Sequence, residues 1–180
     1  MFKTIFNPKF IVAMIGCLIL ISGIAYITTD QDRVSKRFAQ QLFDYPIPTQ
    51  TTLIEEKQYN GHPWGSISSG EWVVVVYQRF STSLSKEEII SYYKKAGLFE
   101  FPKGDVKGVI PQLYFEGDMI RVTEDKGIYY ESNDGGKKPL YSYFNDEDNI
   151  ILKELGNNNE QEYEYVIQLI SGFDFFLNIH

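Results

Sequence analysis

The chain has 180 residues, which is enough for one domain and an appendage. Hydrophobic residues make up 43% of it and aromatic residues 16%, so the chain can bury a substantial core. All 24 acidic residues lie at or after Asp30, together with 15 of the 17 basic residues, so this part carries a net charge of −9. That charge repels phosphate groups, which argues against nucleic-acid binding and against affinity for anionic lipid head groups.

A long apolar segment follows Lys9. Residues 10–27 carry no charge and would form about 27 Å of helix, close to the hydrocarbon thickness of a bilayer, about 30 Å. A small domain cannot cover a helix that is apolar on every side, so the segment predicts a membrane contact through residues 10–27. We therefore expect residues 1–29 to form a cytoplasmic stub and an uncleaved transmembrane anchor.

Two other fates of this segment stay open. Gly23 and Ala25 form a small-x-small pattern at which cleavage would release a secreted domain. Gly16 and Cys17 resemble a lipoprotein attachment site, although the apolar run continues past the cysteine, where a lipoprotein turns polar. A pilin-like helix is disfavoured because Met14 stands where that family carries a glutamate.

The basic residues on the two sides of the segment are nearly balanced, with Lys3 and Lys9 before it and Arg33, Lys36 and Arg37 after it. A short basic leader before the first apolar segment favours an amino terminus inside the cell. We therefore expect a single-pass protein of the cell membrane whose carboxyl-terminal domain lies outside.

A helix is predicted next, within the linker formed by residues 30–47. Val34, Phe38 and Leu42 recur at a spacing of four and so share one face, and Pro46 ends the pattern. The helix is expected either to be a stalk that lifts the domain off the bilayer or to pack on the domain.

Two strands and a helix follow. Residues 51–59 predict a strand, and residues 71–80, apolar on both faces, predict a central strand covered on both sides. The connection between the two strands is rich in glycine and serine and predicts a loop. Residues 85–96 predict a helix that opens with a capping box formed by Ser85 and Glu88.

The rest of the chain alternates apolar segments with turn residues. The expected strands are residues 112–115, 118–124, 127–132, 139–144, 149–155 and 162–171. We expect them to form an antiparallel meander. The predicted fold class is α+β: an N-terminal transmembrane helix, then a mostly antiparallel β-sheet domain with one or two helices in residues 48–180.

The order of strand, glycine-rich loop, apolar strand and "LSKEEIISYYKKAG" helix resembles a group of small uncharacterised exported or membrane-anchored proteins of Gram-positive bacteria. The resemblance covers residues 48–97 and rests on this order rather than on a catalytic motif. It implies an extracytoplasmic domain and carries no function with it.

Few residues suggest chemistry. His62 and Trp64, in the loop between the first two strands, are candidate ligand contacts, but His180 is the one other histidine. Ser83 and Lys86 match S-x-x-K without its companion motifs. The segment NDEDN, residues 145–149, could offer oxygens to calcium but lacks the ligand spacing of a calcium loop. We therefore predict no catalytic residues, no metal site and no cofactor.

The resulting hypothesis is a non-enzymatic, membrane-anchored module that binds a protein or a component of the cell envelope. One alternative is a small envelope hydrolase that uses a pair of carboxylates, and another is a structural subunit of a membrane complex. A concave pocket with two buried carboxylates would favour the hydrolase, whereas an apolar groove would favour binding.

Overall fold

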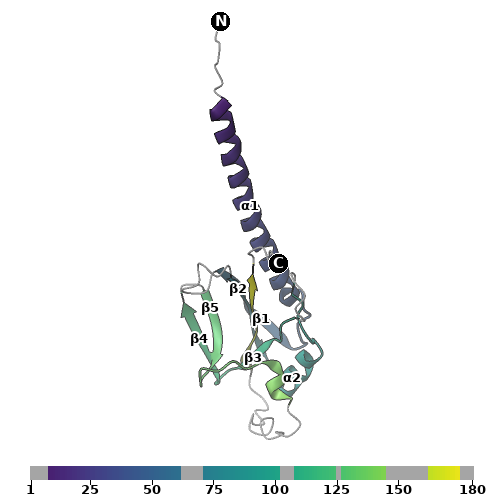
Figure 1. Ribbon diagram of the computed structural model, residues 1–180. Coiled ribbons are helices and arrows are strands. Elements are labelled where there is room, and N and C mark those ends of the chain that lie inside the picture. Colours follow the sequence, from purple (N-terminus) through teal and green to yellow (C-terminus); the bar gives the residue numbers. More distant parts are fainter. Residues whose placement is uncertain (1–7, 62–70, 102–107, 125–126, 145–161, 175–180) are drawn as a thin grey trace.

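The computed structural model describes residues 8–61, 71–101, 108–124, 127–144 and 162–174. A long N-terminal helix leads into a domain of strands and short helices (Figure 1). The elements, in chain order, are α1 (Pro8–Phe43), β1 (Thr51–Gly61), β2 (Glu71–Thr82), α2 (Lys86–Lys94), β3 (Gln112–Phe115), β4 (Met119–Glu124), β5 (Gly127–Ser132), the 3-10 helix η1 (Leu140–Tyr143) and β6 (Tyr163–Asp174). The fold class is α+β, as the sequence predicts.

Helix α1 is one continuous helix that includes both the apolar segment and the helix expected in the linker. Its residues from Ile11 onward are long and apolar enough to cross a membrane, and its most apolar stretch is not buried against the rest of the chain. Nothing in the described part of the domain covers this stretch, so its apolar side chains are available for contact with lipid, as a membrane-spanning helix requires.

The main sheet has the strand order β1-β2-β6-β3, and all its pairings are antiparallel. Strand β2 is central, as predicted, because β1 and β6 pair with its two edges. The expected meander is wrong: β6 inserts between β2 and β3, while β4 and β5 form a separate hairpin. The two longest strands pair with each other: β2 and β6 are matched over twelve residues each, from Glu71↔Asp174 to Thr82↔Tyr163, and this long ladder decides the strand order.

Helices cover one face of the main sheet. Val34, Phe38 and Leu42 of α1 are buried in the principal core, together with Ile89 and Tyr93 of α2. Of the two arrangements expected for the linker helix, packing on the domain is therefore the one observed. The capping box of α2 is also confirmed, because Glu88 N–H donates to Ser85 Oγ and Ser85 N–H donates to Glu88 Oε2.

One predicted strand is wrong. In place of the strand expected at residues 139–144, Leu140–Tyr143 form the short helix η1, which places Leu140 and Tyr143, three residues apart, on the core side. The Tyr143 hydroxyl donates to the Leu113 carbonyl at 2.9 Å, and Ser142 Oγ donates to the Pro139 carbonyl at 2.7 Å. The strand predicted at residues 149–155 lies outside the described residues.

The β4–β5 hairpin covers part of the second face of the sheet. Tyr77, Tyr114, Tyr130 and Val166 form a buried cluster there, in which the rings of Tyr77 and Tyr130 meet edge to face at 5.1 Å between centroids. The domain thus has three layers: helices, the main sheet, and the hairpin.

Candidate functional site

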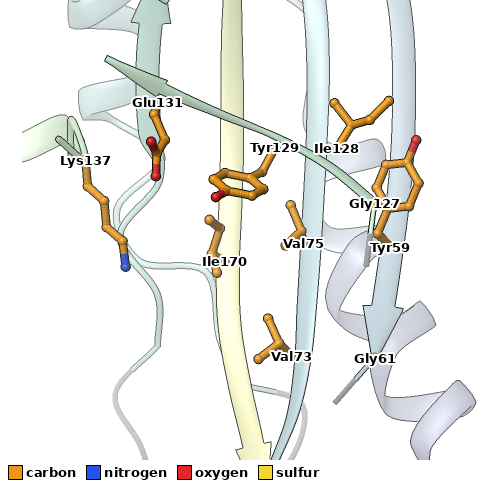
Figure 2. A pocket seen from close by; sticks show the side chains of 10 residues that line it. All are labelled: Tyr59, Gly61, Val73, Val75, Gly127, Ile128, Tyr129, Glu131, Lys137 and Ile170. Atoms are coloured by element: carbon orange, nitrogen blue, oxygen red, sulfur yellow. The ribbon is translucent and has the colours of Figure 1, made fainter. Parts of the chain in front are cut away.

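A pocket of about 270 Å³ lies between the hairpin and the second face of the sheet (Figure 2). Its walls are mostly apolar, and a single acidic and a single basic side chain lie at one end. The lining residues are Tyr59, Gly61, Val73, Val75, Gly127, Ile128, Tyr129, Glu131, Lys137 and Ile170.

The path of β5 creates the pocket. Strand β5 begins against Tyr59 of β1, and its Tyr130 is tied to Gln168 of β6, so β5 crosses the sheet diagonally (Figure 2). In the register of the sheet, Tyr59 lies opposite Val75, while Gln168 lies opposite Tyr77, two residue pairs further along β2. Strand β5 leaves one corner of the sheet only partly covered, on the side of the strand where Val73 lies. We call it the open corner; it consists of Gly61, Val73, Val75 and Ile170.

The side chain of Gln168 of β6 holds β5 in place at Tyr130. Its Oε1 accepts a 2.8 Å hydrogen bond from Tyr130 N–H, and its Nε2 donates to the Tyr130 carbonyl at 3.1 Å. Nε2 also donates to Gln112 Oε1 at 3.0 Å, and the Tyr114 hydroxyl donates to the same oxygen at 2.8 Å. Because Gln168 is fully buried, these bonds avoid the penalty of about 1–3 kcal/mol for an unsatisfied buried polar group.

Gly127 fixes the start of β5. Its φ of +127° disfavours other residues, and an added Cβ would lie 2.2 Å from Cγ of Tyr59. The backbone of β5 therefore lies directly on the Tyr59 ring. Only glycine permits this approach, which closes one end of the pocket.

Replacing Gly127 by alanine should push the hairpin off Tyr59. We expect a loss of about 2–4 kcal/mol of unfolding free energy, because overpacking adds to backbone strain. The control is Gly135→Ala, where φ is +76° but no atom lies within 4 Å of the new Cβ, so strain acts alone. Urea unfolding measures both variants, and equal losses would show that contact with Tyr59 is unimportant.

Strand β2 presents different surroundings on its two faces. Val74 and Val76 are fully buried in the helix-covered core, whereas Val73 and Val75 are half-buried and line the pocket. The alternation follows from the pleat of a strand, which directs successive side chains to opposite faces. These valines therefore provide matched probes of the core and the pocket.

The open corner lies at the end of the sheet where α1 reaches it. Trp72 Nε1–H donates to Ser35 Oγ of α1 at 2.9 Å, and the rings of Phe38 and Phe173 meet edge to face at 5.5 Å. Trp72 and Phe173 are paired neighbours at this end of β2 and β6, directly beside Val73. The exposed apolar part of α1 projects away from the same end (Figure 1).

The charged end of the pocket is formed by Glu131 and Lys137, on the side away from Tyr59 and Gly61 (Figure 2). Among the described residues that line the pocket, Glu131 is the one carboxylate. No group of three His, Cys, Asp or Glu side chains able to hold a metal occurs in the described part of the chain. The pocket thus suits an apolar ligand with a polar end.

A separate charged cluster lies further along the second face. Arg79 NH1 contacts Glu164 Oε2 at 3.1 Å, its Nε lies 3.8 Å from Glu55 Oε2, and Arg121 NH2 lies 3.7 Å from Glu55 Oε1. Since two guanidinium groups here face two carboxylates, the charges are mutually neutralised. Burial raises the pKa of the nearby Tyr77 hydroxyl, with smaller contributions from Glu55 and Tyr130. This cluster therefore joins strands rather than forming an acid–base pair.

The sequence-based candidates do not meet in this site. His62 and Trp64 lie outside the described residues, as do residues 145–149. Ser83 Oγ donates to Gln50 Oε1 at 3.2 Å, while Lys86 Nζ lies over the Phe115 ring, 5.5 Å from its centroid. Ser83 and Lys86 therefore have separate structural contacts.

The sequence pattern does not predict the residues that line the pocket. The sequence predicts a strand covered on both sides for Val73 and Val75, but both are only half-buried. It predicts Gly127 only as the first residue of a strand. Half-burial of one face of β2 is a tertiary property, so no local pattern signals it. Comparison of the chain with known protein families, curated proteins and solved structures finds no match.

Proposed function

We propose that the protein is a single-pass, membrane-anchored module that binds the hydrocarbon part of a ligand in the pocket of the open corner, outside the cytoplasm. The observation that carries this proposal is the half-covered apolar floor of Val73, Val75 and Ile170 beneath β5. Buried apolar contact contributes about 25 cal/mol per Å², so filling this floor stabilises a bound hydrocarbon chain.

Binding fits the pocket better than hydrolysis does. A carboxylate pair would need a second acidic group facing Glu131, and within the described part of the lining the other charged group is Lys137. The acidic residues Glu55 and Glu164 are already engaged by Arg79 outside the pocket. The pocket therefore offers shape and apolar surface, the features of a binding site.

The pocket hypothesis is tested by methyl NMR of the full chain in nanodiscs of phosphatidylglycerol, an anionic lipid that the acidic domain repels, titrated with octanol. We expect the methyl resonances of Val73 and Val75 to shift in a saturable manner. Those of Val74 and Val76, on the opposite face of the same strand, should stay in place. Shifts of all four valines, or of none, would contradict a specific site.

The anchor is tested by intact-mass measurement after membrane extraction. Because residues 10–27 are uncharged and helical, we expect a chain that retains its amino-terminal segment. A chain that begins at Tyr26 would contradict the anchor and establish a secreted form. A lipid-modified Cys17 would instead establish a lipoprotein.

A further inference from the structure

We propose that the pocket takes one hydrocarbon chain of a zwitterionic lipid from the protein's own membrane, with the lipid head group at Glu131 and Lys137. This inference rests on the proposed function and names the ligand class. Three features carry it: the place of the open corner, the size of the pocket, and the charges at its end.

The open corner lies close to the bilayer. Ser35, which bonds to Trp72 beside the corner, is eight residues after Ile27, or about 12 Å along the helix axis. The head-group layer on each side of a bilayer is about 5–8 Å thick. A lipid lifted a few Å from its leaflet can therefore place a chain against Val73 without leaving the membrane entirely.

The pocket holds one chain rather than a whole lipid. Its volume of about 270 Å³ lies just below the range of about 300–1,000 Å³ typical of sites for drug-sized molecules. Val73 lies next to the Trp72–Phe173 pair, at the end of the sheet that α1 reaches. Ile170 lies between the two valines of the floor and Lys137 (Figure 2). A chain on this floor can point back to the bilayer while its polar end reaches the two charges.

The two charges select the head group. Glu131 attracts an ammonium group and Lys137 attracts a phosphate, so a lipid that carries both fits this end. The soluble part of the chain carries a net charge of −9, which repels lipids with a net negative charge. Ethanolamine lipids have the required pair of groups.

The test uses the full chain in nanodiscs that contain phosphatidylethanolamine with a photoreactive diazirine in one acyl chain. After irradiation, peptide mapping should find label in α1, where lipid contact is general, and on Val73, Val75 or Ile128. Val75→Trp and, as a second variant, Val73→Trp fill the pocket and should remove the label there while label on α1 remains. Leu98→Trp, at a residue 47% exposed outside the pocket lining, is the matched control and should keep both labels.

Label confined to α1 in the parent chain would overturn the proposal, as would undiminished pocket label in both tryptophan variants. If octanol still shifted the methyl resonances of Val73 and Val75, the pocket would bind an apolar ligand, and only the proposal that this ligand is a membrane lipid would be wrong. The same acyl chain on phosphatidylglycerol should label the pocket much less. Glu131→Gln and Lys137→Gln should each reduce labelling by the ethanolamine lipid without changing octanol binding; equal labelling by both lipids would overturn the head-group assignment.

Discussion

A chain that begins at Asp30 should fold cooperatively in water, whereas a chain that begins at Thr49 should not. The difference is the carboxyl-terminal part of α1, which contributes Phe38 and Leu42 to the core. Loss of one buried phenylalanine and one buried leucine lowers the free energy of unfolding by about 5–10 kcal/mol. The whole unfolding free energy of a typical domain is about 5–15 kcal/mol.

Circular dichroism and urea unfolding of the two chains measure this difference. Phe38→Ala in the longer chain should lose about 3–5 kcal/mol, and Arg37→Ala, an exposed neighbour in the same helix, should lose little. If the chain from Thr49 unfolded at the same urea concentration as the chain from Asp30, the packing of α1 on the sheet would be irrelevant to stability.

Val76→Asp should unfold the protein, whereas Val73→Asp, on the same strand, should leave it folded and abolish octanol binding. Val76 is 0% exposed in the helix-covered core, so its replacement buries a carboxylate without a partner, at a cost of several kcal/mol. Val73 is half-buried in the open corner, where a carboxylate can reach water but spoils the apolar floor.

Thermal unfolding and octanol titration of both variants separate these effects. The prediction is a loss of the folding transition for Val76→Asp and a retained transition without binding for Val73→Asp. Similar melting of Val76→Asp and the parent would contradict the assignment of this face to the core. Retained octanol binding by Val73→Asp would contradict the assignment of the other face to the ligand.

Local signals in the sequence identify the elements well. The capping box of Ser85 and Glu88 defines the start of α2, and the doubly apolar pattern of residues 71–80 predicts the central strand β2. Pro139 and the spacing of Leu140 and Tyr143 produce a 3-10 helix where alternation suggested a strand, because both side chains then reach the core.

Long-range pairing is what the sequence leaves undetermined. Several apolar segments could border β2, and the choice of β6 depends on a twelve-residue match that only the folded chain displays. The pocket depends on two contacts distant in sequence, Gly127 with Tyr59 and Tyr130 with Gln168. These contacts set the diagonal of β5, so the open corner could not be predicted from local patterns.

The position of a bound heavy atom would show whether the open corner holds an apolar ligand. Crystals of the chain that begins at Asp30, soaked with a bromine-tagged octanol, would give anomalous density at the bromine. We expect a peak between β5 and the pair Val73 and Val75, and we expect Val75→Trp to abolish it. A peak confined to other surfaces, or one that persists in Val75→Trp, would contradict an apolar ligand site in the open corner.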